Sequence, residues 1–200
     1  MSKVITVSRE LGSGGREVGL RLAKKLGIPF YDKELIAMAA EDSNISEDLF
    51  HANDEVIAGQ KRINYDDYAT VDPFSPVYEV PVSDQLFVIQ SKIIQRLAAN
   101  GPCVIIGRCS DVIVEDAFRI FICSSFKKRV ERIQRLEKEP EDIKKLESRI
   151  RAVDANRRDY YQYYSGNEWG KPKNYDLCLN SGTLGIERCV EIIANSVTLE

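Results

Sequence analysis

The stretch VITVSRELGSGGREVGLRLAKKLGIPFYD, residues 4–32, decides the fold. Its first four residues are a short apolar run rich in β-branched side chains, which is typical of a strand buried on both faces of a sheet. After a glycine-rich turn, Val18, Leu22 and Leu26 are spaced as on one face of a helix that ends at Gly27. The last residues before Asp32 resemble a second strand. A strand, a helix and a strand in this short space predict the βαβ unit of a parallel sheet.

The rest of the chain continues this alternation. Further strands are predicted over 103–106, 118–123 and 176–180, and helices over 33–41, 47–60, 83–100 and 186–197, with a mobile loop over 66–82. The pattern therefore predicts an α/β fold with five strands in a mostly parallel sheet. A length of 200 residues suits a single domain.

The turn between the first strand and the first helix contains Gly12, Ser13, Gly14 and Gly15. Glycine permits positive φ, and the N-terminus of the following helix adds free N–H groups and the positive end of its dipole. Arg16, at the start of the helix, supplies a fixed cation. The turn is therefore predicted to bind phosphate, and a tight turn that needs glycine for its shape alone is the alternative.

The turn departs from the usual phosphate-binding pattern G-x-x-x-x-G-K-[ST]. With Gly15 as the second glycine, Glu10 stands in place of the first glycine and Arg16 in place of the lysine. Glu17 replaces the hydroxyl residue that normally reaches Mg²⁺, and Ser13 is the nearest substitute. The positive charge is kept and the hydroxyl is lost.

The dinucleotide-binding fingerprint G-x-G-x-x-G also fits in part. Gly12 and Gly14 match it, and Asp32 ends the second strand near the position of a ribose-binding acid. Its third glycine falls on Glu17. An NAD(P)-binding oxidoreductase therefore remains an alternative.

Basic residues concentrate in residues 126–159, which hold 12 Lys/Arg against 8 Asp/Glu in a chain of net charge −3. Two apolar stripes in this segment predict two helices joined by a tight turn. Arg129, Arg132 and Arg135 recur every three residues on the first helix. On the second, Arg157 continues the apolar stripe, where a guanidinium needs a buried anion, and a nucleotide phosphate is the natural partner. A solvated, salt-bridged hairpin is the alternative.

Composition excludes several classes of protein. The small negative net charge argues against a general nucleic-acid binder. One histidine, His51, leaves little for a histidine-dependent triad or a multi-histidine metal site. The five cysteines show no C-x-x-C spacing and are predicted to be reduced and mostly buried. No stretch resembles a signal peptide or a membrane span, so a cytoplasmic location is expected.

Four motifs, taken in their order and spacing, resemble the cytidylate kinase-like family. They are SRELGSGGRE at 8–17, FYDK at 30–33, VIIGR at 104–108 and DAFRIF at 116–121, and the resemblance runs from residue 3 to about 195. It implies a P-loop NTPase-type fold of three layers in one domain, 1–200, with a helical lid. The core would be 1–42, 83–125 and 174–200, the NMP-binding-like insert 43–82 and the lid region 126–165.

The resemblance also implies a kinase that uses ATP and Mg²⁺ to phosphorylate a nucleoside monophosphate such as CMP, or a related small acceptor. Gly12, Ser13, Gly14, Gly15, Arg16 and Glu17 would bind the donor, Asp32, Lys33, Arg108 and Asp111 the acceptor, and Arg16, Arg129, Arg132, Arg157 and Arg158 would stabilise the transfer. Cys109 stands where the family has an aspartate after Gly-Arg, so Asp111 is offered as its substitute and as a metal ligand, with Glu17 as the other candidate.

The expected partners are small nucleotides, without nucleic acid or membrane, and the oligomeric state is open, a homodimer included. A nucleotide-binding regulator without turnover is the main alternative function. The run of tyrosines over 160–164 fits lid packing, base stacking or an interface equally well.

Overall fold

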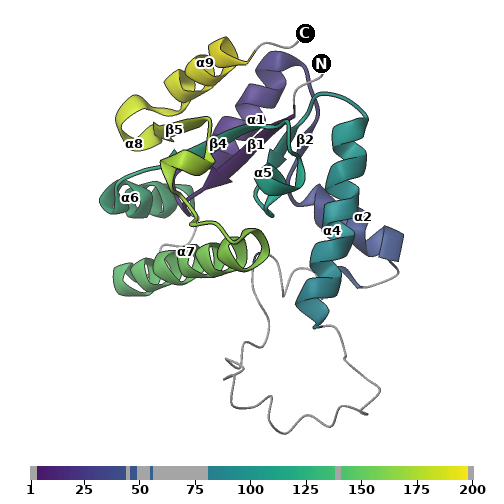
Figure 1. The fold of residues 1–200 in the computed structure, drawn as a ribbon. Coiled ribbons are helices and arrows are strands. Elements are labelled where there is room, and N and C mark those ends of the chain that lie inside the picture. Colours follow the sequence, from purple (N-terminus) through teal and green to yellow (C-terminus); the bar gives the residue numbers. More distant parts are fainter. Residues whose placement is uncertain (1–3, 44–45, 49–54, 56–80, 138–140, 198–200) are drawn as a thin grey trace, which may run out of the picture.

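The computed structural model describes residues 4–43, 46–48, 55, 81–137 and 141–197. Its centre is a five-stranded sheet of order β2-β3-β1-β4-β5, in which all four strand pairs are parallel (Figure 1). The strands are β1 (Ile5–Arg9), β2 (Phe30–Tyr31), β3 (Val104–Ile106), β4 (Phe118–Cys123) and β5 (Leu177–Asn180). The predicted class and the five strands are confirmed.

Helices alternate with the strands. They are α1 (Gly15–Leu26), α2 (Glu34–Ser43), α4 (Val82–Ala99), α5 (Ser110–Ile113), α6 (Phe126–Leu136), α7 (Ile143–Ser165), α8 (Ser181–Leu184) and α9 (Ile186–Ser196), with a 3₁₀ turn over Pro172–Asn174. The short elements α5, α8 and the 3₁₀ turn were not predicted. Most of the helix predicted over 47–60 and of the loop predicted over 66–82 lies outside the described residues.

Two apolar cores hold the sheet between helices. Val104 and Ile106 of β3 pack with α1 and α9 on one face, and Ile105 packs with α2 and α4 on the other. Alternate side chains of a strand point to opposite faces, so this pattern places helices on both sides of the sheet. Figure 1 shows α1 beside α9, and α2 beside α4. The result is the predicted three-layer arrangement.

The helices α6 and α7 form the predicted hairpin. They pack through Val130 and Ile133 of α6 against Leu146 and Ile150 of α7, with Leu11 partly buried beside them. Leu11 follows β1, so the hairpin lies directly against the glycine-rich turn.

The tyrosine run belongs to the last turns of α7. Tyr160 and Tyr161 are buried next to Cys109, and Tyr164 stacks on Phe87 of α4 at 3.8 Å between ring centroids. Tyr160, Tyr161 and Tyr164 therefore serve packing, whereas Tyr163 is exposed.

The strand order bears on the oxidoreductase alternative. Dinucleotide-binding folds of the usual type place β2 next to β1 in the order 3-2-1-4-5-6. Here β3 lies between β2 and β1. The fold therefore does not support the NAD(P) hypothesis.

Within the described ranges, none of the helices is both long and apolar enough to cross a bilayer. All five cysteines are free, and Cys103, Cys109 and Cys189 are buried, as predicted for reduced packing residues, whereas Cys178 is exposed.

Candidate functional site

The glycine-rich turn has the backbone shape that the sequence predicts. Gly12 and Gly14 have φ of 78° and 80°, and α1 begins at Gly15. The buried Ser13 fixes the turn, because its Oγ accepts a hydrogen bond from the Gly15 N–H at 3.3 Å and its carbonyl accepts one from the Ser181 hydroxyl. Apart from that of Gly15, the N–H groups at the start of α1 have no partner within the helix, and a helix N-terminus of this kind favours an anion.

A cavity of about 570 Å³ lies over this turn. Its walls come from the turn, the start of α1, the end of β2 and the α6–α7 hairpin, and they include Gly12, Gly14, Gly15, Arg16, Glu17, Asp32, Lys33, Arg132 and Arg157. A Cβ at Gly14 would collide with the guanidinium of Arg132. Arg132 therefore lies directly against the turn, as a cation that faces a bound phosphate must.

Asp32 closes the cavity at the end of β2. Its Oδ2 accepts a hydrogen bond from Arg16 Nε at 2.6 Å, and its Oδ1 lies 3.5 Å from Arg108 Nη1. The side chain of Arg108 is only 1% exposed. The three residues that the sequence assigned to three different motifs thus meet, although Arg108 is not itself among the residues that line this cavity.

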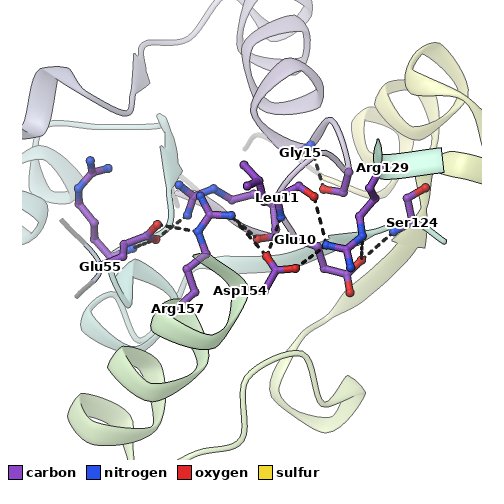
Figure 2. A network of polar contacts seen from close by, with 11 residues as sticks. Glu10, Leu11, Gly15, Glu55, Ser124, Arg129, Asp154 and Arg157 are labelled. Carbon is purple, nitrogen blue, oxygen red and sulfur yellow. Dashed lines mark hydrogen bonds and ion pairs between the residues drawn. The ribbon is translucent and has the colours of Figure 1, made fainter. Parts of the chain in front are cut away.

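A second set of contacts surrounds Glu55, a residue that the sequence did not single out. Its Oε1 lies 2.6 Å from Arg9 Nη1, and its Oε2 lies 2.9 Å from Arg157 Nε. The backbone N–H of Arg108 also donates to Oε1, at 3.2 Å. We call Glu55, Arg9 and Arg157 the Glu55 cluster (Figure 2), and all three line the cavity.

Electrostatics explain why a carboxylate can be buried here. Burial alone would raise the pKa of Glu55, but the charges of Arg9, Arg157 and Arg108 outweigh it and lower that pKa well below its usual value. Burial also lowers the pKa of Arg9, against the attraction of Glu55. Glu55 is therefore ionised at neutral pH.

A third set of contacts holds the turn to the hairpin, and we call Arg129, Asp154 and Glu10 the Arg129 cluster. Arg129 donates to Asp154 and, at 3.1 Å, to the carbonyl of Leu11, while the Leu11 N–H donates to Asp154 Oδ1 at 2.8 Å. Glu10 Oε2 accepts from the Ser124 N–H at 2.9 Å and lies 3.6 Å from Arg129 Nε. Figure 2 shows Asp154 between Arg157 and Arg129. Arg129 is buried and is not among the residues that line the cavity.

Asp111 lies apart from the cavity over the turn. It is in α5, where its Oδ2 accepts a hydrogen bond from Tyr161 at 2.8 Å, and burial raises its pKa to about 6. It lines a different cavity, of about 310 Å³, with Arg119 and Lys173. The structure therefore does not bring Asp111 to the glycine-rich turn.

Arg158 is likewise not among the residues that line the cavity, and it is exposed on α7 whereas its neighbour Arg157 is not. Glu17 is a carboxylate that lines the cavity beside the turn, as Glu10 does on the other side of the turn. In the described part of the chain, no group of three or more His, Cys, Asp or Glu side chains forms a metal site by itself.

The sequence missed Arg9, Glu55 and Asp154 for different reasons. Arg9 directly precedes Glu10, which stands where the usual motif has its first glycine, and this departure from the motif does not indicate what either side chain contacts. Asp154 follows Val153 on the inward side of α7, which is a weak signal of a buried partner. Glu55 carries no pattern, since only the folded chain brings it to Arg9, 46 residues away.

Comparisons with known proteins bear on the family and the fold of the chain. Residues 4–183 match the model of the cytidylate kinase-like family. An uncharacterized protein from Eubacterium ventriosum superposes with a TM-score of 0.71 at 22% identity, covering 97% of both chains. Shikimate kinase from Bacteroides thetaiotaomicron superposes with a TM-score of 0.57 at 14% identity, covering 98% of both chains. TT1252 from Thermus thermophilus superposes with a TM-score of 0.53 at 16% identity, also covering 98% of both chains.

These structural likenesses show the fold, which is that of P-loop kinases. No curated protein matches the chain significantly. The family match spans residues 4–183, which is most of the chain, and the shikimate kinase among the structural neighbours shares its fold. The chain belongs to the cytidylate kinase-like family.

Proposed function

We propose that this protein transfers the γ-phosphoryl group of ATP to a small acceptor, a nucleoside monophosphate such as CMP or a related compound. The observation that carries the proposal is the convergence of three cationic side chains on one cavity. Arg16 from α1, Arg132 from α6 and Arg157 from α7 all line the space over the glycine-rich turn. Phosphoryl transfer depends on cations spread around the transferring group, since the protein contributes mainly positioning and charge stabilisation.

The donor phosphates would lie at the turn. The open N–H groups at the start of α1 would bind them, together with the side chains of Arg16 and Arg132. A second cavity, also of about 570 Å³, shares Glu17 and Arg132 with the first and continues to Leu184 and Ile186. Its apolar and guanidinium groups suit the nucleoside of the donor, which we place there.

The acceptor would lie at the other end of the first cavity, near Asp32, Lys33 and Arg108. A phosphate acceptor needs no general base, because its oxygen is already ionised at neutral pH. For a hydroxyl acceptor, the Asp32 carboxylate would accept the hydrogen bond of the attacking group.

Magnesium is implied by the kinase family, and the residues present fit it. Mg²⁺ at such sites needs only one or two protein carboxylates, besides phosphate oxygens and water. Glu17 and Asp32 both line the cavity and both pair with an arginine, but the side chain of Glu17 is 38% exposed and that of Asp32 only 7%. We therefore assign Glu17 as its ligand in preference to Asp111. The ion would neutralise charge on the transferring group.

The hairpin supplies the remaining cations. We propose 126–165 as the lid region and 43–82 as the insert of a single domain, with Arg157 covering the acceptor side of the cavity. Water excluded by the hairpin would strengthen each of these electrostatic contacts. Arg129 would act through the backbone of the turn that it holds, and the role of Arg158 stays a prediction.

An ATP-dependent transfer assay tests the proposal. ADP release is measured with Mg²⁺ and a panel of acceptors that includes CMP, the other nucleoside monophosphates and shikimate. We expect ADP release that depends on one acceptor class, and a thermal shift with ATP. Absence of both would contradict the assignment.

The second candidate, a nucleotide-binding regulator, is favoured by one observation, the glutamate at position 17 where the usual motif has a hydroxyl residue. It predicts a thermal shift with ATP and no ADP release with any acceptor. The same two measurements therefore separate the two functions.

A further inference from the structure

The carboxylate of Glu55 is held as a bound anion would be. Two guanidinium groups and one backbone N–H, from Arg9, Arg157 and Arg108, converge on its two oxygens within 3.2 Å. Its side chain is 10% exposed, and Arg9 and Arg157 are almost as buried, at 11% and 13%. Paired guanidinium groups and a main-chain amide are the donors that proteins use for phosphate and carboxylate ligands.

The backbone is shaped for this contact. Gly107, Arg108 and Cys109 follow one another with φ of 67°, 55° and 54°. Non-glycine residues rarely adopt this conformation, so the bend after β3 is strained and held by its surroundings. At Gly107, a Cβ would collide with both the Arg9 guanidinium and the Glu55 carboxylate. The absence of a side chain at 107 is thus what lets an anion approach the main chain here.

The location is that of a ligand site. The bend follows β3 and Arg9 ends β1, so the contact lies at the carboxyl ends of two neighbouring parallel strands, where open α/β sheets bind ligands. Glu55, Arg9 and Arg157 line the same cavity as the glycine-rich turn and Asp32. The sequence predicted a buried anion for Arg157, and the anion found there belongs to the protein itself.

Charge balance favours an anion at this place. The positive charges of Arg157 and Arg108 lower the pKa of Arg9, whereas Glu55 raises it. Asp32 lies 3.5 Å from Arg108 and Asp154 lies 3.9 Å from Arg157, so part of the positive charge is balanced by these carboxylates. A buried charge without a partner costs several kcal/mol, so an oxyanion beside Arg9 and Arg157 stabilises the arrangement.

We propose that Arg9, Arg157 and the N–H of Arg108 form a binding site for an oxyanion of the acceptor, and that Glu55 competes with it from within the molecule. This inference rests on the proposed function for the identity of the ligand as an acceptor. Glu55 thereby sets the acceptor affinity, because a phosphate or carboxylate group has to displace a carboxylate that is already paired.

Glu55→Gln tests the competition, since the amide keeps the size of the side chain and removes its charge. Binding of inorganic phosphate and, separately, of acetate is measured by thermal shift and calorimetry without ATP. We expect Glu55→Gln to bind at least one of the two probes about tenfold more tightly than the original protein, and to be stabilised more by it. A gain with phosphate alone identifies a phosphoryl ligand, and a gain with acetate alone a carboxylate ligand.

Two further variants control the experiment. Glu137→Gln also removes a glutamate paired with an arginine, Arg149, but away from the cavity, and should leave anion binding unchanged. The double variant Glu55→Gln/Arg157→Gln removes one donor of the site and should lose the gain. If Glu55→Gln is unstable on its own, millimolar phosphate or acetate should restore its folding, as a ligand that fills the site would.

Equal or weaker binding of both probes by Glu55→Gln, or instability that neither probe relieves, would overturn the inference. That result would make Glu55 a purely structural partner of Arg9 and Arg157. Because the measurement needs neither ATP nor turnover, its failure is distinct from a failure of the transfer assay.

Discussion

Two arginine–carboxylate clusters join α7 to the end of β1, and they differ in what lies beside them. In the Arg129 cluster, Asp154 is enclosed by Arg129 and the main chain of Leu11. In the Glu55 cluster, one helical turn further along α7, Arg157 and Glu55 face a cavity. Both clusters pair arginine guanidinium groups with carboxylates. Access to the cavity, and not the kind of ion pair, therefore separates a structural contact from a candidate binding site.

The variant Asp154→Ala tests most directly whether the Arg129 cluster is structural. The change removes the nearer of the two carboxylates of the buried Arg129, leaving Glu10 at 3.6 Å, and takes the acceptor from the Leu11 N–H, so we expect a loss of about 3 kcal/mol in the free energy of unfolding. Urea denaturation measures it. Asp142→Ala on the same helix removes only an exposed N-cap that accepts from Lys144 and Lys145, and should cost about 1 kcal/mol. Similar losses in the two variants would show that the Arg129 cluster is not structural.

Arg157 and Arg158 are adjacent on α7, so variants of the two compare an arginine that lines the cavity with one that does not. Arg157→Ala should lower kcat/KM by about a hundredfold, equivalent to about 2.7 kcal/mol, because it removes a cavity cation. Arg158→Ala, at an exposed position, should lower it less. Steady-state kinetics on variants with matched folded fractions gives the answer. A larger loss for Arg158 would restore the role that the family resemblance implied for it.

The smallest effect concerns the buried carboxylate of Asp111, which accepts a hydrogen bond from Tyr161. The pKa of Asp111 is raised from 3.8 to about 6 by burial, so its neutral form stabilises the fold and this stability is lost as pH rises through 6. Asp111→Asn should therefore be stabilising relative to the original protein, by about 1 kcal/mol more at pH 8 than at pH 5. Thermal unfolding at the two pH values checks it, with the exposed Asp116→Asn as control. If the difference in stability between Asp111→Asn and the original protein did not change with pH, the raised pKa of Asp111 would be contradicted.

The fold was largely predictable from the sequence, because its determinants are local. The β-branched runs and the helical stripes, such as Val18 and Leu22 in α1, give the class and most of the element order. The missed elements, α5 and α8, are four residues long and too short for a periodic signal.

The site was predictable only in part. The glycine-rich turn, Asp32 and Arg132 carry motif or spacing signals, and the structure places them around one cavity. Arg129 carries the same spacing signal as Arg132 but faces the main chain of Leu11, because three-residue spacing rotates successive side chains around the helix. Glu55 has no local signal at all, since its contacts come from residues 46 and 102 positions away.

The contacts of Leu11 have a mechanical consequence. Its N–H and its carbonyl are both bonded to the hairpin, through Asp154 and Arg129, so the residue before Gly12 is clamped to two helices at once. If α7 swung outward as a rigid rod, it would pull on the strand that leads into the turn. The hairpin and the turn are therefore mechanically coupled, and a displacement of either one is transmitted to the other.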